Sequence, residues 1–144
     1  MKQHIIGLLL AIAAFSACDI EHSNNGNLDG YWQLTQLDTI ATGGSADMKE
    51  SAIYWAVQHN LLEIKNVNDL LRNVFFRFEQ SEATLRIYNP ISDNKVISDS
   101  VVTSPVTLQP FGIQHLDETL AIEQLTSSHM TLRNELFRFH FRKY

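Results

Sequence analysis

The chain has 144 residues, of which 11 are Lys or Arg and 16 are Asp or Glu, so its formal net charge is −5. This length suits one domain with its own buried core, and an acidic chain without a basic cluster argues against nucleic acid as a partner. Cys18 is the only cysteine. The chain can therefore form neither an internal disulfide nor a zinc site built from several cysteines.

The first seventeen residues have the pattern of an export signal. Lys2 gives a basic start, and an apolar run covers residues 5–15. This run has the length of a signal-peptide core and is shorter than the roughly 20 apolar residues that a spanning helix needs. Two small residues then precede Cys18. We predict that residues 1–17 are a signal peptide.

The segment Phe15-Ser16-Ala17-Cys18 resembles the bacterial lipobox, in which the cysteine is lipidated and becomes the first mature residue. The resemblance implies acyl chains at Cys18 that anchor the protein to a membrane, since two or more chains give stable anchoring. The alternative is an ordinary cleaved signal with an incidental cysteine. Asp19 and Glu21 follow, as in the surface-export signals of Bacteroidetes lipoproteins. In enteric bacteria an Asp directly after the lipidated cysteine would instead indicate retention in the inner membrane. We favour the outer membrane of the cell envelope and leave the leaflet open.

The chain directly after the cysteine is polar and carries few apolar side chains. Such a composition is typical of flexible segments. We expect residues 18–27 to be the lipidated cysteine and a flexible tether. Residues 28–144 are expected to form one domain.

From residue 30 onward the dominant pattern is an alternation of apolar and polar residues, which indicates strands. Eight segments show it, with turn residues between most of them, and predict an all-β, antiparallel sandwich or barrel. Residues 46–51 and 67–71 are candidates for one helical turn each, and residues 109–113 for a short plug at one end of the sheet. The positions expected to face inward are Trp32, Leu34, Ile53, Trp55, Val57, Leu62, Ile64, Val74, Phe76, Phe78, Leu85, Ile87, Leu120, Ile122, Met130, Leu132, Phe137, Phe139 and Phe141.

Gly30-Tyr31-Trp32 on the first strand matches the Gly-x-Trp signature of lipocalins. The C-terminal segments 120–125, 130–132 and 136–142 resemble small lipocalin-like lipoproteins of Bacteroidetes, which are domains of unknown function. The resemblance implies an antiparallel up-and-down, lipocalin-like barrel of about eight strands, closed or nearly closed.

In lipocalins the tryptophan of this signature packs across the closed end of the barrel, and a basic residue near the last strand covers it. The resemblance therefore implies a barrel-closing role for Gly30 and Trp32. The candidates for the basic cover are Arg133, Arg138 and Arg142.

A barrel of eight strands is just wide enough to be filled by side chains or to hold one small ligand. The inward positions are almost wholly apolar, so a pocket would take an apolar or amphipathic small molecule. Its expected lining is Trp55, Phe76, Phe78, Phe137 and Phe139. A filled core is the alternative, because few polar residues are in phase with the inward face to orient a ligand.

No residue pattern predicts catalysis or a cofactor. The histidines show no metal-ligand spacing, and we expect no metal site. Ser127-Ser128-His129 reads as an ordinary turn, because a catalytic triad is a spatial arrangement that adjacency does not supply. Asp117-Glu118 also reads as a solvated turn, and residues 42–45 lack the lysine of a phosphate-binding loop.

Arg138, His140 and Arg142 form a basic stripe on one face of the last strand. The stripe is expected to be the solvent face of that strand, with a contact surface for an acidic partner as the alternative.

The sequence predicts a non-catalytic, lipid-anchored protein of the cell envelope that binds a small apolar ligand in its barrel. The alternative is a structural or interaction subunit with a filled barrel that acts through its outer surface. The membrane is the expected partner, and the sequence identifies no protein partner.

Overall fold

The structure, a computed structural model, describes residues 23–93 and 98–144. The predicted signal peptide, Cys18 and residues 19–22 lie outside the described residues. In the described ranges, no helix is both long enough and apolar enough to cross a membrane.

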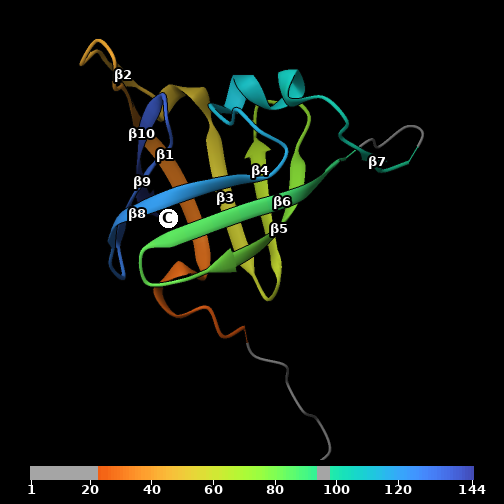
Figure 1. Cartoon of the computed structure of the whole chain (residues 1–144), viewed down its shortest axis with the longest axis horizontal. Helices are drawn as coiled ribbons and strands as arrows, with labels where there is room; N and C mark the ends of the chain where they lie inside the picture. Colours follow the sequence, from red (N-terminus) through yellow and green to blue (C-terminus); the bar gives the residue numbers. More distant parts are fainter. Residues whose placement is uncertain (1–22, 94–97) are drawn as a thin grey trace, which may run out of the picture.

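The described chain is built of strands and short 3₁₀ helices (Figure 1). In chain order these are η1 (Gly26–Leu28), β1 (Gly30–Thr39), β2 (Ser45–Asp47), η2 (Lys49–Ser51), β3 (Ile53–Gln58), β4 (Leu61–Asn66), β5 (Val74–Gln80), β6 (Thr84–Ser92), β7 (Ser100–Val101), η3 (Pro105–Phe111), β8 (Glu118–Leu125), β9 (His129–Arg133) and β10 (Phe137–Lys143).

Eight of these strands form a closed barrel. Strands β1, β3, β4, β5, β6, β8, β9 and β10 each pair antiparallel with the next, and β10 returns to pair with β1. The short strands β2 and β7 attach to β1 and β6. The predicted all-β, antiparallel up-and-down barrel of eight strands is therefore confirmed, and each of the eight predicted segments is one of its strands.

The alternating pattern sets the register between neighbouring strands. Trp32 pairs with Trp55, and Trp55 pairs with Ile64, so one inward row crosses β1, β3 and β4. All three side chains are fully buried. Because the side-chain period of a strand is two, a slip of one residue would turn this whole row to solvent.

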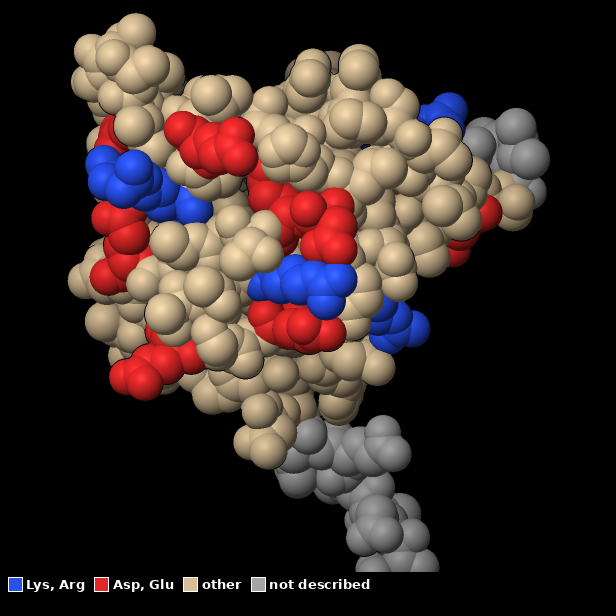
Figure 2. All heavy atoms as spheres, in the orientation of Figure 1, with Lys and Arg blue, Asp and Glu red and all other residues tan. Residues whose placement is uncertain are grey.

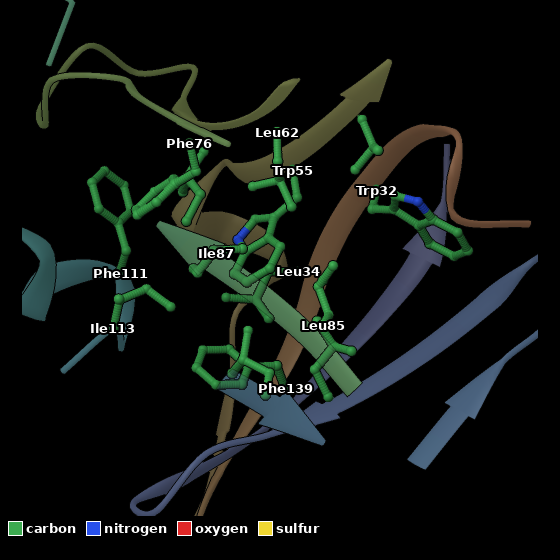
Figure 3. Packing of buried hydrophobic residues seen from close by; sticks show 14 of the residues in the cluster. Trp32, Leu34, Trp55, Leu62, Phe76, Leu85, Ile87, Phe111, Ile113 and Phe139 are labelled. Carbon is green, nitrogen blue, oxygen red and sulfur yellow. The ribbon is translucent and has the colours of Figure 1, made fainter. Parts of the chain in front are cut away.

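The barrel interior is lined by large apolar side chains that pack in one cluster (Figure 3). The ring centroid of Trp55 lies 6.0 Å from that of Phe139 and 5.0 Å from that of Phe141. Phe111 and Ile113 enter the same cluster from the chain at η3. The core is thus one contiguous cluster, to which all eight barrel strands contribute.

One end of the barrel is closed around Trp32. Its indole Nε1 donates a hydrogen bond of 2.9 Å to the carbonyl oxygen of Leu28 in η1. The ammonium of Lys143 lies 4.7 Å from the centroid of the Trp32 ring and donates to the carbonyl of Asn27 at 2.9 Å. Gly30 has a φ of +132°, and a Cβ there would lie 3.2 Å from Lys143 Cε. This tryptophan is therefore enclosed by η1 and the last strand.

The basic cover of Trp32 is Lys143, which corrects the expectation that an arginine takes this role. Arg138 donates to Glu123 at 2.9 Å, and Arg142 donates to Gln33 at 3.0 Å. The reason is the alternation along β10: position 143 is in phase with the inward positions 139 and 141, whereas 138 and 142 are out of phase.

The other end is covered by η3 (Figure 1). Leu108 and Phe111 of this helix and Ile113 after it are buried. Gly112 ends the helix with a φ of +82°, and a Cβ there would lie 2.8 Å from Phe139 Cε1. The plug predicted at residues 109–113 is thus present and starts earlier, at Pro105.

The two predicted helical turns are only partly present. The first becomes strand β2 followed by η2, and residues 67–71 form turns without a helix. The buried side chain of Asn66 explains the second case, because its oxygen accepts from the backbone N–H of Leu70 at 2.8 Å and of Leu71 at 3.3 Å. Its amide nitrogen donates to the carbonyl of Ser51 at 3.0 Å. These bonds replace those of a helical turn.

The folded domain starts before residue 28. Ser23 Oγ donates to Asp29 Oδ1 at 2.6 Å, and Asn25 donates to the same carboxylate from its backbone and its side chain. Asn25 also reaches the carbonyl of His59, whose own N–H donates to Ser23 Oγ at 2.7 Å. Residues 23–27, which we expected in the flexible tether, are therefore held against the barrel.

Replacing the tryptophan at the closed end should destabilise the fold. We expect Trp32→Ala to lower the free energy of unfolding by about 3–5 kcal/mol, the usual cost of truncating a buried aromatic side chain. Denaturant unfolding of the variant measures this loss. Trp32→Phe, which retains one aromatic ring, should lose less. An unchanged midpoint for Trp32→Ala would contradict the buried position.

Candidate functional site

The five rings expected to line an internal ligand site all join the core. Trp55, Phe76 and Phe139 are at most 1% exposed. Phe78 and Phe137 are half-buried and pack against the same cluster. None of these rings lines either of the two hollows described on the protein. In the described residues they pack against other core side chains, as the filled-core alternative requires.

The indole nitrogen of Trp55 is a polar group inside this apolar core. Among the described residues, it is the single buried side-chain nitrogen or oxygen atom that has no hydrogen-bond partner. Figure 3 shows the ring between Leu34, Ile87 and Phe139, none of which offers a side-chain acceptor. A buried N–H without an acceptor costs about 1–3 kcal/mol. A ligand atom that accepts a hydrogen bond from this N–H would therefore remove this cost.

A hollow of about 660 Å³ lies on the outside of the barrel, over β1, β3, β4 and β5. One row of cross-strand neighbours crosses it: Tyr31 pairs with Ala56, Ala56 with Glu63, and Glu63 with Phe75. Because Ala56 is small, the surface dips between the rings of Tyr31 and Phe75. Sequence analysis had not singled out this row, because outward positions read as an ordinary solvent face.

The Tyr31 wall of the hollow is braced by two further rings. Tyr54 stacks on Tyr31 with centroids 4.8 Å apart and planes 12° apart. Tyr144 meets both rings edge-on, at 6.0 and 5.8 Å. The backbone N–H of Tyr144 also donates to the carbonyl of Tyr31 at 2.8 Å. These contacts hold the tyrosine in place on the rim.

The described lining of the hollow carries two carboxylates and neither lysine nor arginine. Burial raises the pKa of Glu63, and the ammonium of Lys65, 3.9 Å away, partly opposes this shift. Burial also acts to raise the pKa of Asp29, but hydrogen bonds from Ser23 and Asn25 outweigh it, so that this pKa lies below its usual value. The hollow is therefore apolar at its base and negatively charged.

Glu118 is buried, which corrects its interpretation as part of a solvated turn. Its side chain accepts from the backbone N–H of Gln114 at 3.0 Å and from Asn134 Nδ2 at 3.3 Å. Burial raises its pKa. Asn134 also donates to the carbonyl of Gly112 at 2.9 Å. The pair thus fixes the loop after η3, whereas Asp117 stays at the surface in an ion pair.

Each side chain of the basic stripe on β10 has a polar partner on another strand. Arg138 and Arg142 have the partners given above, and His140 Nε2 lies 2.7 Å from Asp38 Oδ2. Figure 2 shows Lys and Arg atoms next to Asp and Glu atoms on parts of the face that it presents. The stripe is therefore a paired outer face of the strand.

The serine and histidine of the last hairpin lie next to each other without forming a triad. Ser128 Oγ is 2.9 Å from His129 Nδ1 on an exposed turn. The described residues give this imidazole no carboxylate partner. Nor does the described part of the chain contain a group of three or more His, Cys, Asp or Glu side chains placed to hold a metal ion.

A closed up-and-down barrel of eight strands, with a 3₁₀ helix and a buried tryptophan at one end, defines a small β-barrel of the lipocalin type. The family model of the lipocalin-like domain matches residues 13–144, and the chain belongs to this family.

Two solved structures share the fold. One is described as a lipocalin-like protein from Bacteroides uniformis ATCC 8492; it is 21% identical, with a TM-score of 0.62, and the match covers 83% of this chain and 100% of that one. The other is an uncharacterized protein from Bacteroides eggerthii DSM 20697, 17% identical with a TM-score of 0.59, and the match covers 81% of this chain and 98% of that one. No curated protein matches the chain.

The network at Asp38 should make stability depend on pH. Hydrogen bonds from Gln36, His140 and Ser45 lower the pKa of Asp38 from 3.8 to about 2. The ionised carboxylate therefore stabilises the fold above pH 3.8, and this contribution is lost as the pH falls towards 2.

Asp38→Asn tests this dependence. Denaturant unfolding at about pH 5 should show the variant to be less stable than the wild type, and the difference should shrink at about pH 2.5. A difference of the same size at both values would show that the carboxylate charge does not stabilise the fold.

Proposed function

We propose that this protein is a non-catalytic, lipid-anchored binding protein of the cell envelope, in which a filled barrel is the scaffold and the outer surface binds. One observation carries this proposal. The rings expected to line an internal site are packed in the core, while the larger described hollow lies outside the barrel, over four neighbouring strands.

The position of the anchor supports the proposal. Cys18 precedes Ser23 by five residues, a segment that reaches at most about 18 Å when fully extended. Ser23 is hydrogen-bonded to Asp29 and His59 at the closed end of the barrel, and it lines the outer hollow. An acylated Cys18 would therefore hold the hollow-bearing end of the domain towards the membrane, and the outer membrane is the proposed site.

The surface chemistry supports a non-catalytic role. The exposed pair Ser128 and His129 has no described acid to orient it, and a triad needs both this acid and an oxyanion hole. The buried carboxyl of Glu118 is engaged by Gln114 and Asn134. These groups are therefore used in structural contacts.

A second candidate function has one observation in its favour. Lipocalin-like folds commonly bind small hydrophobic ligands, and Trp55 Nε1 is a buried donor without an acceptor. A small apolar molecule carrying one oxygen acceptor would satisfy this donor. It would have to displace core side chains, because Trp55 is fully buried.

Removing the lipidation site tests the anchor. We expect Cys18→Ser to move the protein from the membrane fraction to the soluble fraction, because no other cysteine can accept the lipid. Fractionation with incorporation of a labelled fatty acid measures both properties. His22→Ala, a change in the same segment, should remain acylated and membrane-bound. Membrane retention of Cys18→Ser would show that lipid on this cysteine is not the anchor.

A brominated fatty acid tests the filled barrel. In Trp32→Phe the remaining tryptophan is Trp55, and bromine quenches an indole only in close contact. We expect no saturable quenching, because this ring is enclosed by core side chains. Quenching that saturates at one equivalent of the fatty acid would place the ligand inside the barrel and favour the second candidate.

A further inference from the structure

The outer hollow has the volume of a small-molecule site. Its volume of about 660 Å³ falls within the range of roughly 300–1,000 Å³ typical of ligand pockets. Tyr31 and Phe75 stand three strand spacings apart, about 14 Å between backbones. Ala56 lies between them and leaves room above the sheet for a flat molecule, with the two rings as end walls.

The charged groups of the hollow favour a positively charged ligand. Glu63 lies in the same row, between Ala56 and Phe75, and Asp29 lies on the rim beside Tyr31. Lys65 is near Glu63 but is not part of the described lining. A cation bound at Glu63 would add to the partial stabilisation that Lys65 gives this partly buried carboxylate.

The aromatic wall adds a second reason for a cation. Cations are attracted to the face of a tyrosine or phenylalanine ring, more strongly when both are shielded from water. The Tyr31 ring is held by Tyr54 and Tyr144, so little side-chain freedom is lost when a ligand packs against it. An anion would instead meet two carboxylates.

We propose that the hollow over β1, β3, β4 and β5 binds an organic cation with a flat apolar body, which lies on Ala56 between Tyr31 and Phe75 and places its charge at Glu63. This inference rests on the proposed outer-face function and names the ligand class for it. Single-point changes at Glu63 and Ala56 separate the role of charge from the role of shape.

The probe is 9-aminoacridine, a flat cation, and its comparison is acridine, which has the same ring system and is mostly neutral at pH 7. Both are titrated by isothermal calorimetry into the purified protein in a neutral detergent, with detergent-alone titrations subtracted. We expect saturable binding of one equivalent of 9-aminoacridine. Glu63→Gln should weaken this binding about tenfold, as expected for loss of a charged contact, and should leave acridine binding nearly unchanged.

Two further variants are the controls. Glu135→Gln makes the same chemical change in the turn between β9 and β10, at the other end of the barrel, and should bind the cation as the wild type does. Ala56→Leu fills the space between the rings and should weaken both probes. Thermal unfolding of each variant shows that it remains folded.

The outcomes separate this inference from the function on which it rests. Equal binding of 9-aminoacridine by the wild type and Glu63→Gln, or tighter binding of acridine, would overturn the assignment of a cation. If a neutral probe binds and Ala56→Leu abolishes it, the outer-face function stands without the cation. If neither probe binds and the brominated fatty acid quenches Trp55 saturably, both the inference and the outer-face function fail.

Discussion

The pairing of β10 with β1 is the interaction on which the rest of the structure depends. It pairs residues that lie 98 to 111 positions apart in the chain and leaves no open edge in the eight-stranded barrel. Its register places Lys143 opposite Trp32 and Phe141 opposite Leu34. The same register therefore closes the sheet, brings a cation over the buried tryptophan, and turns the phenylalanines of β10 into the interior.

Closure also determines what the outer surface can do. Successive side chains of a strand point to opposite faces of the sheet. The residues between the large inward side chains therefore form rows across neighbouring strands on the outer surface. Where such a row contains a small residue between two rings, as at Ala56, the surface becomes concave. The hollow is thus a consequence of the barrel register together with one alanine. The packed core lies beneath the strands that carry the hollow, so a packed interior is compatible with a binding site on the outer face.

The period of two in the sequence was enough to predict the eight strands and most of the core, because burial in an antiparallel barrel repeats with that period. Glu118 is in phase with Leu120, and Lys143 is in phase with Phe141, so the same rule applied strictly would have placed both inward. They were missed because a charged residue was assumed to be solvated, and because the cover of Trp32 was taken from the family pattern.

The outer hollow could not be predicted in this way, since it depends on lateral pairing between hairpins, which no local pattern specifies. Residues 23–27 were missed because their polar composition resembles flexible chain, although their short side chains make hydrogen bonds to Asp29 and His59.

These same five residues connect the proposed anchor to the proposed binding site. Ser23 lines the hollow and is also the residue nearest to Cys18 in the described chain. Its bonds to Asp29 and to the turn between β3 and β4 fix the point at which the chain leaves the barrel. A tether from residue 18 to residue 22 is half the length expected from composition alone, so under the proposed lipidation of Cys18 it would hold the closed end near the lipid. A ligand would then reach the hollow from the space between the domain and the membrane surface, where organic cations are enriched if the lipids are anionic. The short tether and the negative charge of the hollow therefore favour the same class of ligand.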